Sequence, residues 1–205
     1  MNLVELVKKT VETYIKEGKI ISPPEDLPEE FLEKKAGTFV TINIKLTTDN
    51  KQLRGCIGTY LPTRHNIAEE IIQNAISAAT EDYRFGPIQK EELPYLSYTV
   101  YILSEPELVL MKEVSDPPKF FLEKLRRANL DPKKYGIIVK TVPITYSDTN
   151  VVFNGHLVAK TGLLLPDLEG VNTIEQQISI ACQKGGIDPQ GDKILIYKFT
   201  VEKYQ

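Results

Sequence analysis

The chain has 205 residues, of which 41% are hydrophobic and 26% are charged. This composition is typical of a globular protein, and one compact domain can reach this length. The net charge of −3 gives no general attraction to nucleic acids or anionic membranes, which favour basic surfaces. Two cysteines and two histidines are too few for a disulfide framework or a structural metal site, so no cofactor is predicted.

The N-terminal segment does not have the features of a signal peptide. Charged residues such as Glu5, Lys8 and Lys9 interrupt it every few positions, so it has no continuous apolar core. No other stretch approaches the ~20 consecutive apolar residues that a membrane-spanning helix needs. We therefore expect a cytoplasmic protein that does not associate with membranes.

The first half of the chain alternates between two spacings of apolar residues. Apolar residues at every fourth position are typical of an amphipathic helix, and those at every second position are typical of a half-buried strand. With turn and capping residues as boundaries, the predicted elements are a helix from Leu3 to Gly18, a strand at 39–47, a turn at Asp49-Asn50, a hairpin strand at 52–60, a helix from Asn66 to about Thr80 and a strand at 97–103.

The second half uses the same patterns. Its predicted elements are a helix from Asp116 toward Asn129, strands at 136–141, 151–153 and 157–165, a helix from Thr173 to Gly185 and a closing strand at 193–202. Strand pairs on short turns, mixed with helices, indicate an α+β fold with a mainly antiparallel sheet. No linker separates two halves, so residues 1–205 are predicted to form a single domain, with two closely packed subdomains as the alternative.

The segment at 53–59 is unusual for a strand because it contains two glycines, Gly55 and Gly58. Glycine weakens a strand, so the pair predicts a bulge or the close approach of another group to the backbone. In a regular strand Arg54, Cys56 and Gly58 share one face. A guanidinium group beside a thiol stabilises the thiolate, which makes Cys56 a candidate catalytic nucleophile. The alternative role for Cys56 is that of a small apolar residue in the core.

Arg84 is a second candidate binding residue, in the loop that follows the helix at 66–80. If that helix packs on the sheet, Arg84 meets the face that carries Arg54 and Cys56. Two arginines beside a thiol suit a carboxylate or phosphate group, because each can donate two hydrogen bonds. The alternative is a surface ion pair of Arg84 with Asp82 or Glu81.

Structural roles are expected for the other candidate residues. Cys182 lies in an amphipathic helix and is expected in the core. His65 would act with Cys56 only if the fold brought the two side chains within hydrogen-bond reach, and His156 is expected in a solvated loop. A basic cluster complements the negative end of a helix dipole, with RNA contact as the alternative; its members are Lys124, Arg126, Arg127, Lys133 and Lys134.

Four stretches form an ordered set of short motifs: 53–59 (LRGCIGT), 82–87 followed by 91–94 (DYRFGP and EELP), 162–166 (GLLLP) and 182–187 (CQKGGI). This set resembles the motifs of the AMME chromosomal region candidate (AMMECR-type) family, in a match that spans about residue 38 to the end of the chain. The sequence departs from the family pattern at Gly86, where proline is usual, and at Tyr135, where histidine is frequent. It also has no tryptophan.

The family resemblance implies a fold and a set of partners. The implied fold has two β–α repeats that share one barrel-like, mainly antiparallel sheet with flanking helices. The implied partners are a Memo-type protein and a radical-SAM protein, which form a three-component AmmeMemoRadiSam set with the AMMECR-type protein. The resemblance supplies no reaction.

Three functional hypotheses follow. The first is a domain that binds a small ligand or a modified peptide in a pocket formed by Arg54, Gly55, Cys56, Gly58 and Arg84, with Cys56 as the candidate nucleophile. The second is a non-enzymatic adaptor whose strand at 53–59 docks a Memo-type or radical-SAM protein. The third is an RNA-associated factor, which the acidic net charge disfavours.

Overall fold

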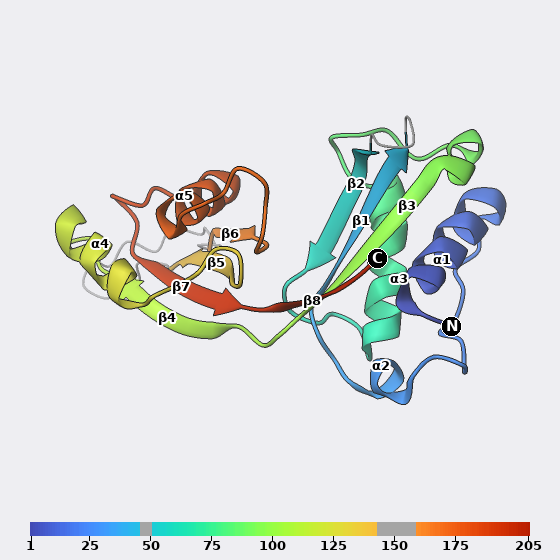
Figure 1. Ribbon diagram of the computed structural model, residues 1–205, viewed down its shortest axis with the longest axis horizontal. Coiled ribbons are helices and arrows are strands. Elements are labelled where there is room, and N and C mark those ends of the chain that lie inside the picture. The colour runs from blue at the N-terminus through green and yellow to red at the C-terminus, as the bar shows by residue number, and fades with distance from the viewer. Residues whose placement is uncertain (46–50, 143–158) are drawn as a thin grey trace, which may run out of the picture. The chain divides into compact units, whose positions relative to one another are not determined.

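The computed structural model describes residues 1–45, 51–142 and 159–205 (Figure 1). Its elements are, in chain order, α1 (Leu3–Glu17), α2 (Glu29–Glu33), β1 (Thr38–Lys45), β2 (Lys51–Thr59), α3 (Ile67–Thr80), the 3-10 helix η1 (Lys90–Tyr95), β3 (Leu96–Leu103), β4 (Glu107–Lys112), α4 (Pro118–Arg127), β5 (Gly136–Thr141), β6 (Thr161–Leu164), α5 (Ile174–Gly185), β7 (Ile194–Phe199) and β8 (Val201–Tyr204). The predicted turn at Asp49-Asn50, the predicted strand at 151–153 and His156 lie outside the described residues.

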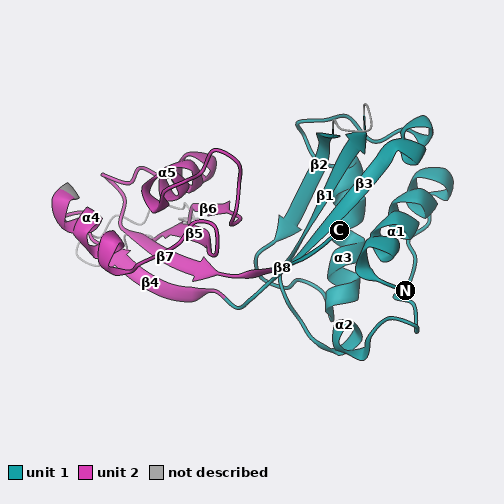
Figure 2. Cartoon of the chain, viewed as in Figure 1, with its two compact units in different colours: residues 1–105, 202–205 teal, residues 106–201 magenta. Residues whose placement is uncertain are grey.

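The chain divides into two compact units: unit 1 is Met1–Glu105 with Glu202–Gln205, and unit 2 is Pro106–Val201 (Figure 2). Each unit has its own cluster of buried apolar side chains. In unit 1, α1 and α3 pack against each other and against the sheet, and Leu6, Ile42 and Ile71 are completely buried. In unit 2, α5 packs on β5 and β6. That both units belong to one folding domain stays a prediction.

Among the described residues, both units contain the same run of two strands, an α-helix and a third strand. This repeat consists of β1, β2, α3 and β3 in unit 1, and of β5, β6, α5 and β7 in unit 2. The two sheets have the strand orders β2-β1-β3-β8 and β4-β7-β5-β6. The fourth strands are exchanged, because β4 follows β3 along the chain but pairs with β7, whereas β8 follows β7 but pairs with β3.

The predicted α+β class, with a mainly antiparallel sheet and two β–α repeats, is confirmed. The strands that the family resemblance placed in one barrel-like sheet form two four-stranded sheets, and within the described residues neither sheet closes into a barrel. The single strand predicted at 193–202 is interrupted at Thr200, because its two parts, β7 and β8, pair in different sheets. The sequence patterns do not predict β4, since a bulge between Leu108 and Leu110 breaks its alternation.

In each repeat the helix approaches its neighbouring strand closely at a glycine. A Cβ atom on Gly55 of β2 would overlap the carbonyl oxygen of Ala78 in α3. In the same way, a Cβ atom on Gly162 of β6 would overlap the carbonyl oxygen of Ala181 in α5. Only glycine lets a strand and a helix backbone come this close. The close approach predicted for the two-glycine segment is therefore confirmed at Gly55.

In both repeats a side-chain amide of the helix binds the chain where the first strand begins: at Thr38, the first residue of β1, and at Tyr135, the residue before β5. Asn74 of α3 donates a hydrogen bond through Nδ2 to the carbonyl oxygen of Thr38, at 3.1 Å. Gln177 of α5 donates through Nε2 to the carbonyl oxygen of Tyr135, at 2.9 Å. Asn74 and Gln177 are both buried. The two units thus share this hydrogen bond from a helix amide side chain to a backbone carbonyl, as well as the order of their elements.

Candidate functional site

The strand that carries residues 53–59, β2, is irregular at Arg54. Gly55 pairs with Ile42 of β1 and Leu53 pairs with Asn43, so no residue of β1 lies opposite Arg54. An extra residue of this kind is a β-bulge, which redirects the side chain that it carries. The bulge predicted from the glycine pair is present, and Arg54 therefore departs from the regular alternation that would place it beside Cys56.

The Arg54 side chain is held by the segment that follows α3. Its Nε and Nη2 atoms donate to the two carboxylate oxygens of Glu92, at 2.6 and 3.0 Å. Nη1 and Nη2 also donate to the carbonyl oxygens of Gly86 and Pro87, at 2.8 and 3.3 Å. The hydrogen bonds from Arg54 lower the pKa of Glu92 from its ordinary value. The charge of Arg54 is thus neutralised within the fold, and the guanidinium group fastens β2 to residues 86–92.

The outer edge of β2 is covered by the loop after α3. β2 is the outermost strand of its sheet, and the backbone N–H of Cys56 donates to Asp82 Oδ2 at 2.8 Å. Arg84 Nη2 donates to the carbonyl oxygen of Cys56, at 3.5 Å. Arg84 is itself bound to Asp82 through Nε and Nη2, at 2.9 and 2.7 Å. Because open strand edges invite pairing with other chains, this ion pair protects β2 from strand addition at Cys56.

Asp82 is the electrostatic centre of this contact. Its side chain is almost completely buried, whereas that of Arg84 is 43% exposed. The hydrogen bonds from Arg84, and then that from the Cys56 N–H, lower the pKa of Asp82 to about 2, against the opposing effect of burial. The same pairing with Asp82 raises the pKa of Arg84. The ion pair of Arg84 with Asp82 that the sequence offered as an alternative is therefore present, but its carboxylate is buried and not on the surface, and both residues also bind the backbone of Cys56.

The thiol of Cys56 is half-buried on the face of the sheet opposite the glycine contact with α3. Its Sγ atom lies 3.2 Å from Thr41 Oγ1 on β1. On the same face, Phe39 lies against Gly58, where a Cβ atom would overlap the phenylalanine ring. The two glycines are therefore needed for different contacts: Gly55 leaves room for the backbone of a helix, and Gly58 leaves room for an aromatic side chain.

The five residues of the predicted pocket do not all point to one place. Arg84 reaches the backbone of Cys56, but both guanidinium groups are engaged by carboxylates of the chain. Ligand binding by Arg54, Gly55, Gly58 and Arg84, and catalysis by Cys56, stay predictions.

The structure gives the other candidate residues ordinary environments. Cys182 is buried in the core of unit 2, as predicted, and burial raises the pKa of its thiol to about 11. His65 is exposed, and its backbone N–H donates to Glu69 at 3.2 Å. In the basic cluster, Lys124 pairs with Asp116 at 3.2 Å. In the ranges that the structure describes, no helix is long and apolar enough to cross a membrane, and no group of three or more His, Cys, Asp or Glu side chains is placed to hold a metal ion.

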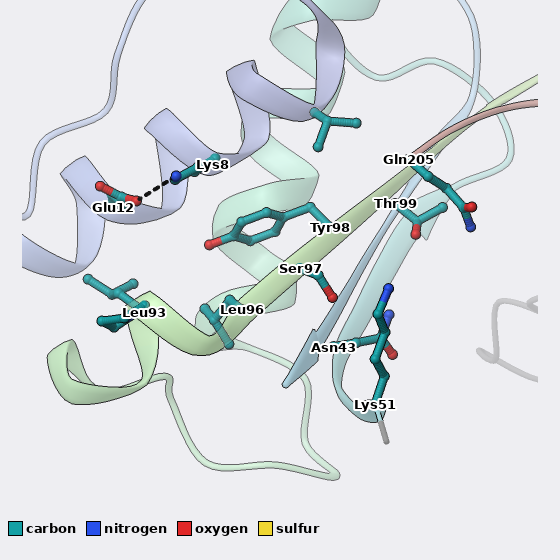
Figure 3. A pocket seen from close by; sticks show the side chains of 12 residues that line it. Lys8, Glu12, Asn43, Lys51, Leu93, Leu96, Ser97, Tyr98, Thr99 and Gln205 are labelled. Carbon is teal, nitrogen blue, oxygen red and sulfur yellow. Dashed lines mark ion pairs between the residues drawn. The ribbon is translucent and has the colours of Figure 1, made fainter. Parts of the chain in front are cut away.

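A cavity of about 410 Å³ lies in unit 1 between α1, η1 and β3 (Figure 3). This volume is in the range of small-molecule sites, roughly 300–1,000 Å³. Lys8 and Glu12 line it from α1, Leu93 and Pro94 from η1, and Tyr98 from β3. Sequence reasoning missed this site, because Tyr98 reads as one more apolar position of an alternating strand.

Two residues of the cavity wall carry buried hydroxyl groups that lack hydrogen-bond partners among the described residues. Ser97 Oγ and Tyr98 Oη are both shielded from solvent, and neither has a partner among the residues that the structure describes. Tyr98 is only 7% exposed, and burial, followed by the nearby charge of Glu12, raises the pKa of its hydroxyl. Buried polar groups are normally hydrogen-bonded, because leaving one unpaired costs free energy.

The segment at 53–59 supports the wall of this cavity. Arg54 binds Glu92, and the next two residues, Leu93 and Pro94, line the cavity. The motif at 91–94 therefore contains both the residue that binds Arg54 and two residues that line the cavity. Arg54 positions the wall through Glu92 without lining the cavity itself.

We expect Arg54→Lys to destabilise the protein by roughly 2 kcal/mol. Lysine is a single point charge, so it cannot reproduce the fork that binds both oxygens of Glu92 and two carbonyl groups. Urea denaturation measures the effect, with Arg64→Lys as the matched control, because Arg64 is exposed. Equal stability of the two variants would contradict the role assigned to Arg54.

Comparisons with known proteins agree with this fold. A Thermotoga maritima protein is 44% identical over 197 residues, which are 96% of this chain and 93% of that protein. A Clostridium acetobutylicum protein is 39% identical over 98% of this chain, which spans 34% of that longer protein. The crystal structure of uncharacterized protein PH0010 from Pyrococcus horikoshii matches with a TM-score of 0.75 and 33% identity, covering 98% of this chain and 88% of that one. The family model AMMECR1 matches residues 4–204, and the chain therefore belongs to the AMMECR1 family.

Proposed function

We propose that this protein binds a small ligand or a modified peptide, and that the binding site is the cavity at Tyr98. The observation that carries the proposal is the pair of buried hydroxyl groups, of Ser97 and Tyr98, that lack partners among the described residues. Both residues line a cavity of about 410 Å³. A bound ligand that fills the cavity and draws the two side chains toward it would supply the missing hydrogen-bond partners.

The lining of the cavity suits a ligand with polar and apolar parts. Leu93 and Pro94 provide apolar surface, whereas Lys51 provides a cation for which the described residues offer no ion-pair partner. Glu12 is already held between two lysines, Lys8 at 3.9 Å and Lys16 at 3.1 Å. Pockets of this composition orient a ligand with a few polar groups and hold it by apolar contact.

The predicted site residues have a supporting role in this proposal. Arg54 fixes Glu92 and so the wall at Leu93, and Gly55 lets α3 pack against β2. Asp82 and Arg84 are engaged with each other, so an anionic ligand at Arg84 would have to compete with a carboxylate of the chain. These contacts support the cavity at Tyr98, not the thiol of Cys56, as the ligand site.

An adaptor function is the second candidate, and the side chain of Tyr83 favours it. Tyr83 lies in the loop that covers Cys56, and 94% of its surface is exposed. Tyrosine is enriched among the residues that contribute most to protein interfaces. By family resemblance, a Memo-type or radical-SAM protein is the partner to test, with Tyr83→Ala as the variant that should weaken the complex.

The test of ligand binding is a fragment screen by ¹H–¹⁵N NMR of the full chain. We expect hits to shift the amide signals of Leu93, Ser97 and Tyr98, and we expect Tyr98→Phe to weaken their binding about tenfold, the loss for one hydrogen bond of about 1.4 kcal/mol. The same variant should keep or raise the stability, by about 1 kcal/mol, because it removes a buried group that has no partner within the described ranges. Tyr95→Phe is the matched control, since Tyr95 is 57% exposed.

The alternative outcomes are distinct. If the fragments shift mainly the amide signals of Cys56, Gly58 and Arg84, the proposal that the cavity is the binding site is wrong. Such a result would support the pocket predicted from the sequence. A library without hits would overturn the ligand-binding function and leave the adaptor function.

A further inference from the structure

The outer edge of β3 is only partly covered by its neighbour. β3 has eight residues, and β8, which pairs with it, has four. About half of this edge therefore extends beyond β8. Gln205, the residue that follows β8, lines the cavity together with Ser97, Tyr98 and Thr99 (Figure 3). The cavity thus lies where β8 stops and the edge of β3 continues.

The hydrogen-bond alternation of the sheet shows which backbone groups face this edge. In an antiparallel sheet, both backbone groups of a residue point to the same side, and successive residues point to opposite sides. The N–H of Cys56 points away from β1, because it donates to Asp82. Its partner Thr41 must then direct its backbone groups to β3, where it pairs with Thr99. Thr99 consequently faces β1, and the N–H and C=O of Tyr98 face the outer edge.

The cavity extends past the edge of β3, so it has one wall on each face of the sheet. Side chains of successive strand residues point to opposite faces of a sheet, so Tyr98 and Ser97 diverge although both line the cavity. Figure 3 shows Tyr98 directed toward α1, with Lys8 on that side, and Asn43 and Lys51 on the side of Ser97. An added strand has this same alternation, with one side chain for each wall.

We propose that the ligand of the cavity is a short extended peptide segment, which adds to the free edge of β3 in line with β8. This inference rests on the proposed ligand-binding function and specifies its ligand. β8 itself shows that this edge accepts a strand. At about 3.3 Å per residue, the free positions of β3 accommodate roughly four peptide residues. The peptide backbone pairs with Tyr98, and its successive side chains point alternately to the wall at Tyr98 and to the wall at Ser97.

The first experiment uses a pool of acetylated, amidated tetrapeptides with the full chain. Binding members of the pool should shift the amide signals of 96–99. They should also slow hydrogen exchange of the Tyr98 amide at least tenfold, because its N–H faces the added strand. The Thr99 amide is the internal control, since its N–H already faces β1 and its exchange rate should hardly change.

The second experiment tests backbone pairing by N-methylation of the tightest-binding peptide. In an added strand, alternate N–H groups point to β3, so methylation at one set of alternate positions should weaken binding at least tenfold. Methylation at the other set should be tolerated, because those N–H groups point away from the sheet. The peptide methylated at one set of positions is thus the matched control for the peptide methylated at the other set.

The results separate this inference from the function on which it rests. Fragments that bind at Tyr98, in a protein that binds no peptide of the pool, would overturn the peptide ligand and keep the ligand-binding function. Peptides that bind equally well with either set of methyl groups would overturn strand addition. If neither fragments nor peptides bind at Tyr98, both proposals are wrong.

Discussion

The Gly55→Ala variant is expected to lose about 3 kcal/mol of unfolding free energy, a large effect for one methyl group. The new Cβ atom would overlap the carbonyl oxygen of Ala78, which is part of the α3 backbone and has no rotamer by which to move away. Either α3 shifts away from β2 or β2 distorts, and both responses disturb a core in which Ile71 and Ala75 are completely buried. Overpacking of this kind costs roughly 1–3 kcal/mol, and more where backbone must move.

Urea denaturation of the variant and of Gly86→Ala measures this effect. Gly86 is a suitable control because a Cβ atom there would meet nothing within 4 Å, and its φ angle is not in the left-handed region. Its contact with Arg54 is made by the backbone carbonyl, which alanine keeps. We expect Gly86→Ala to remain within about 0.5 kcal/mol of the unchanged protein. A Gly55→Ala variant as stable as this control would show that α3 and β2 are not in close contact.

The equivalent variant in the other unit, Gly162→Ala, tests whether the chain folds as one domain. Its Cβ atom would overlap the carbonyl oxygen of Ala181, so a comparable loss is expected. The sheet of unit 1 contains β8, which follows the repeat of unit 2 along the chain, and the sheet of unit 2 contains β4, which follows the repeat of unit 1. Each sheet therefore needs a strand from beyond the other repeat. We therefore expect both variants to shift one shared unfolding transition. Two separate transitions would mean that the predicted single domain is wrong.

The helices α1, α3, α4 and α5 were predictable because their signals are local. Asn2 accepts from the Glu5 N–H and Glu5 accepts from the Asn2 N–H, both at 2.9 Å, so the start of α1 is fixed within four residues. Its end at Gly18 has a positive φ of 69°, which glycine adopts without strain. Neighbouring residues can reveal such features without knowledge of the fold.

The exchange of strands was not predictable, because alternation shows which face of a strand is buried but not which sheet contains it. The pattern continues from Ile194 to Glu202 through Thr200, where the chain passes from the sheet of unit 2 to that of unit 1. β4 was missed for a related reason: its bulge shifts the alternation, and Leu108 is 58% exposed. Both features depend on pairing between distant segments.

The candidate site was only partly predictable for the same reason. Residues 53–59 stood out because glycines are unfavourable in strands, and the structure gives each glycine a packing reason. The partner of Arg54 is Glu92, 38 positions away, and nothing in the spacing connects them. The cavity is lined by ordinary residue types from several elements, so Tyr98 carries no signal until its hydroxyl is found buried with no partner in the part of the chain that the structure describes.

The Asp82→Asn variant is expected to destabilise the protein by roughly 2 kcal/mol at neutral pH. The amide keeps an oxygen for the Cys56 N–H but removes the negative charge that holds Arg84. Breaking a fully buried ion pair costs about 3–5 kcal/mol. The side chain of Arg84 is 43% exposed, so water compensates part of this loss. Asp167→Asn is the matched control, because Asp167 is exposed and asparagine tolerates its positive φ of 55°.

The pH dependence of this effect separates the ion pair from a general packing defect. The pKa of Asp82 is about 2 in the folded protein, below its ordinary value of 3.8. A carboxyl group with a lowered folded pKa stabilises the fold above its unfolded value, and this stabilisation is lost as the pH falls through the folded value. The free-energy difference between the unchanged protein and Asp82→Asn should therefore be constant above about pH 5 and shrink toward pH 2. Asp167→Asn should show no such change, and a difference for Asp82→Asn that persists undiminished at pH 2 would mean that lost packing, not lost charge, destabilises the variant.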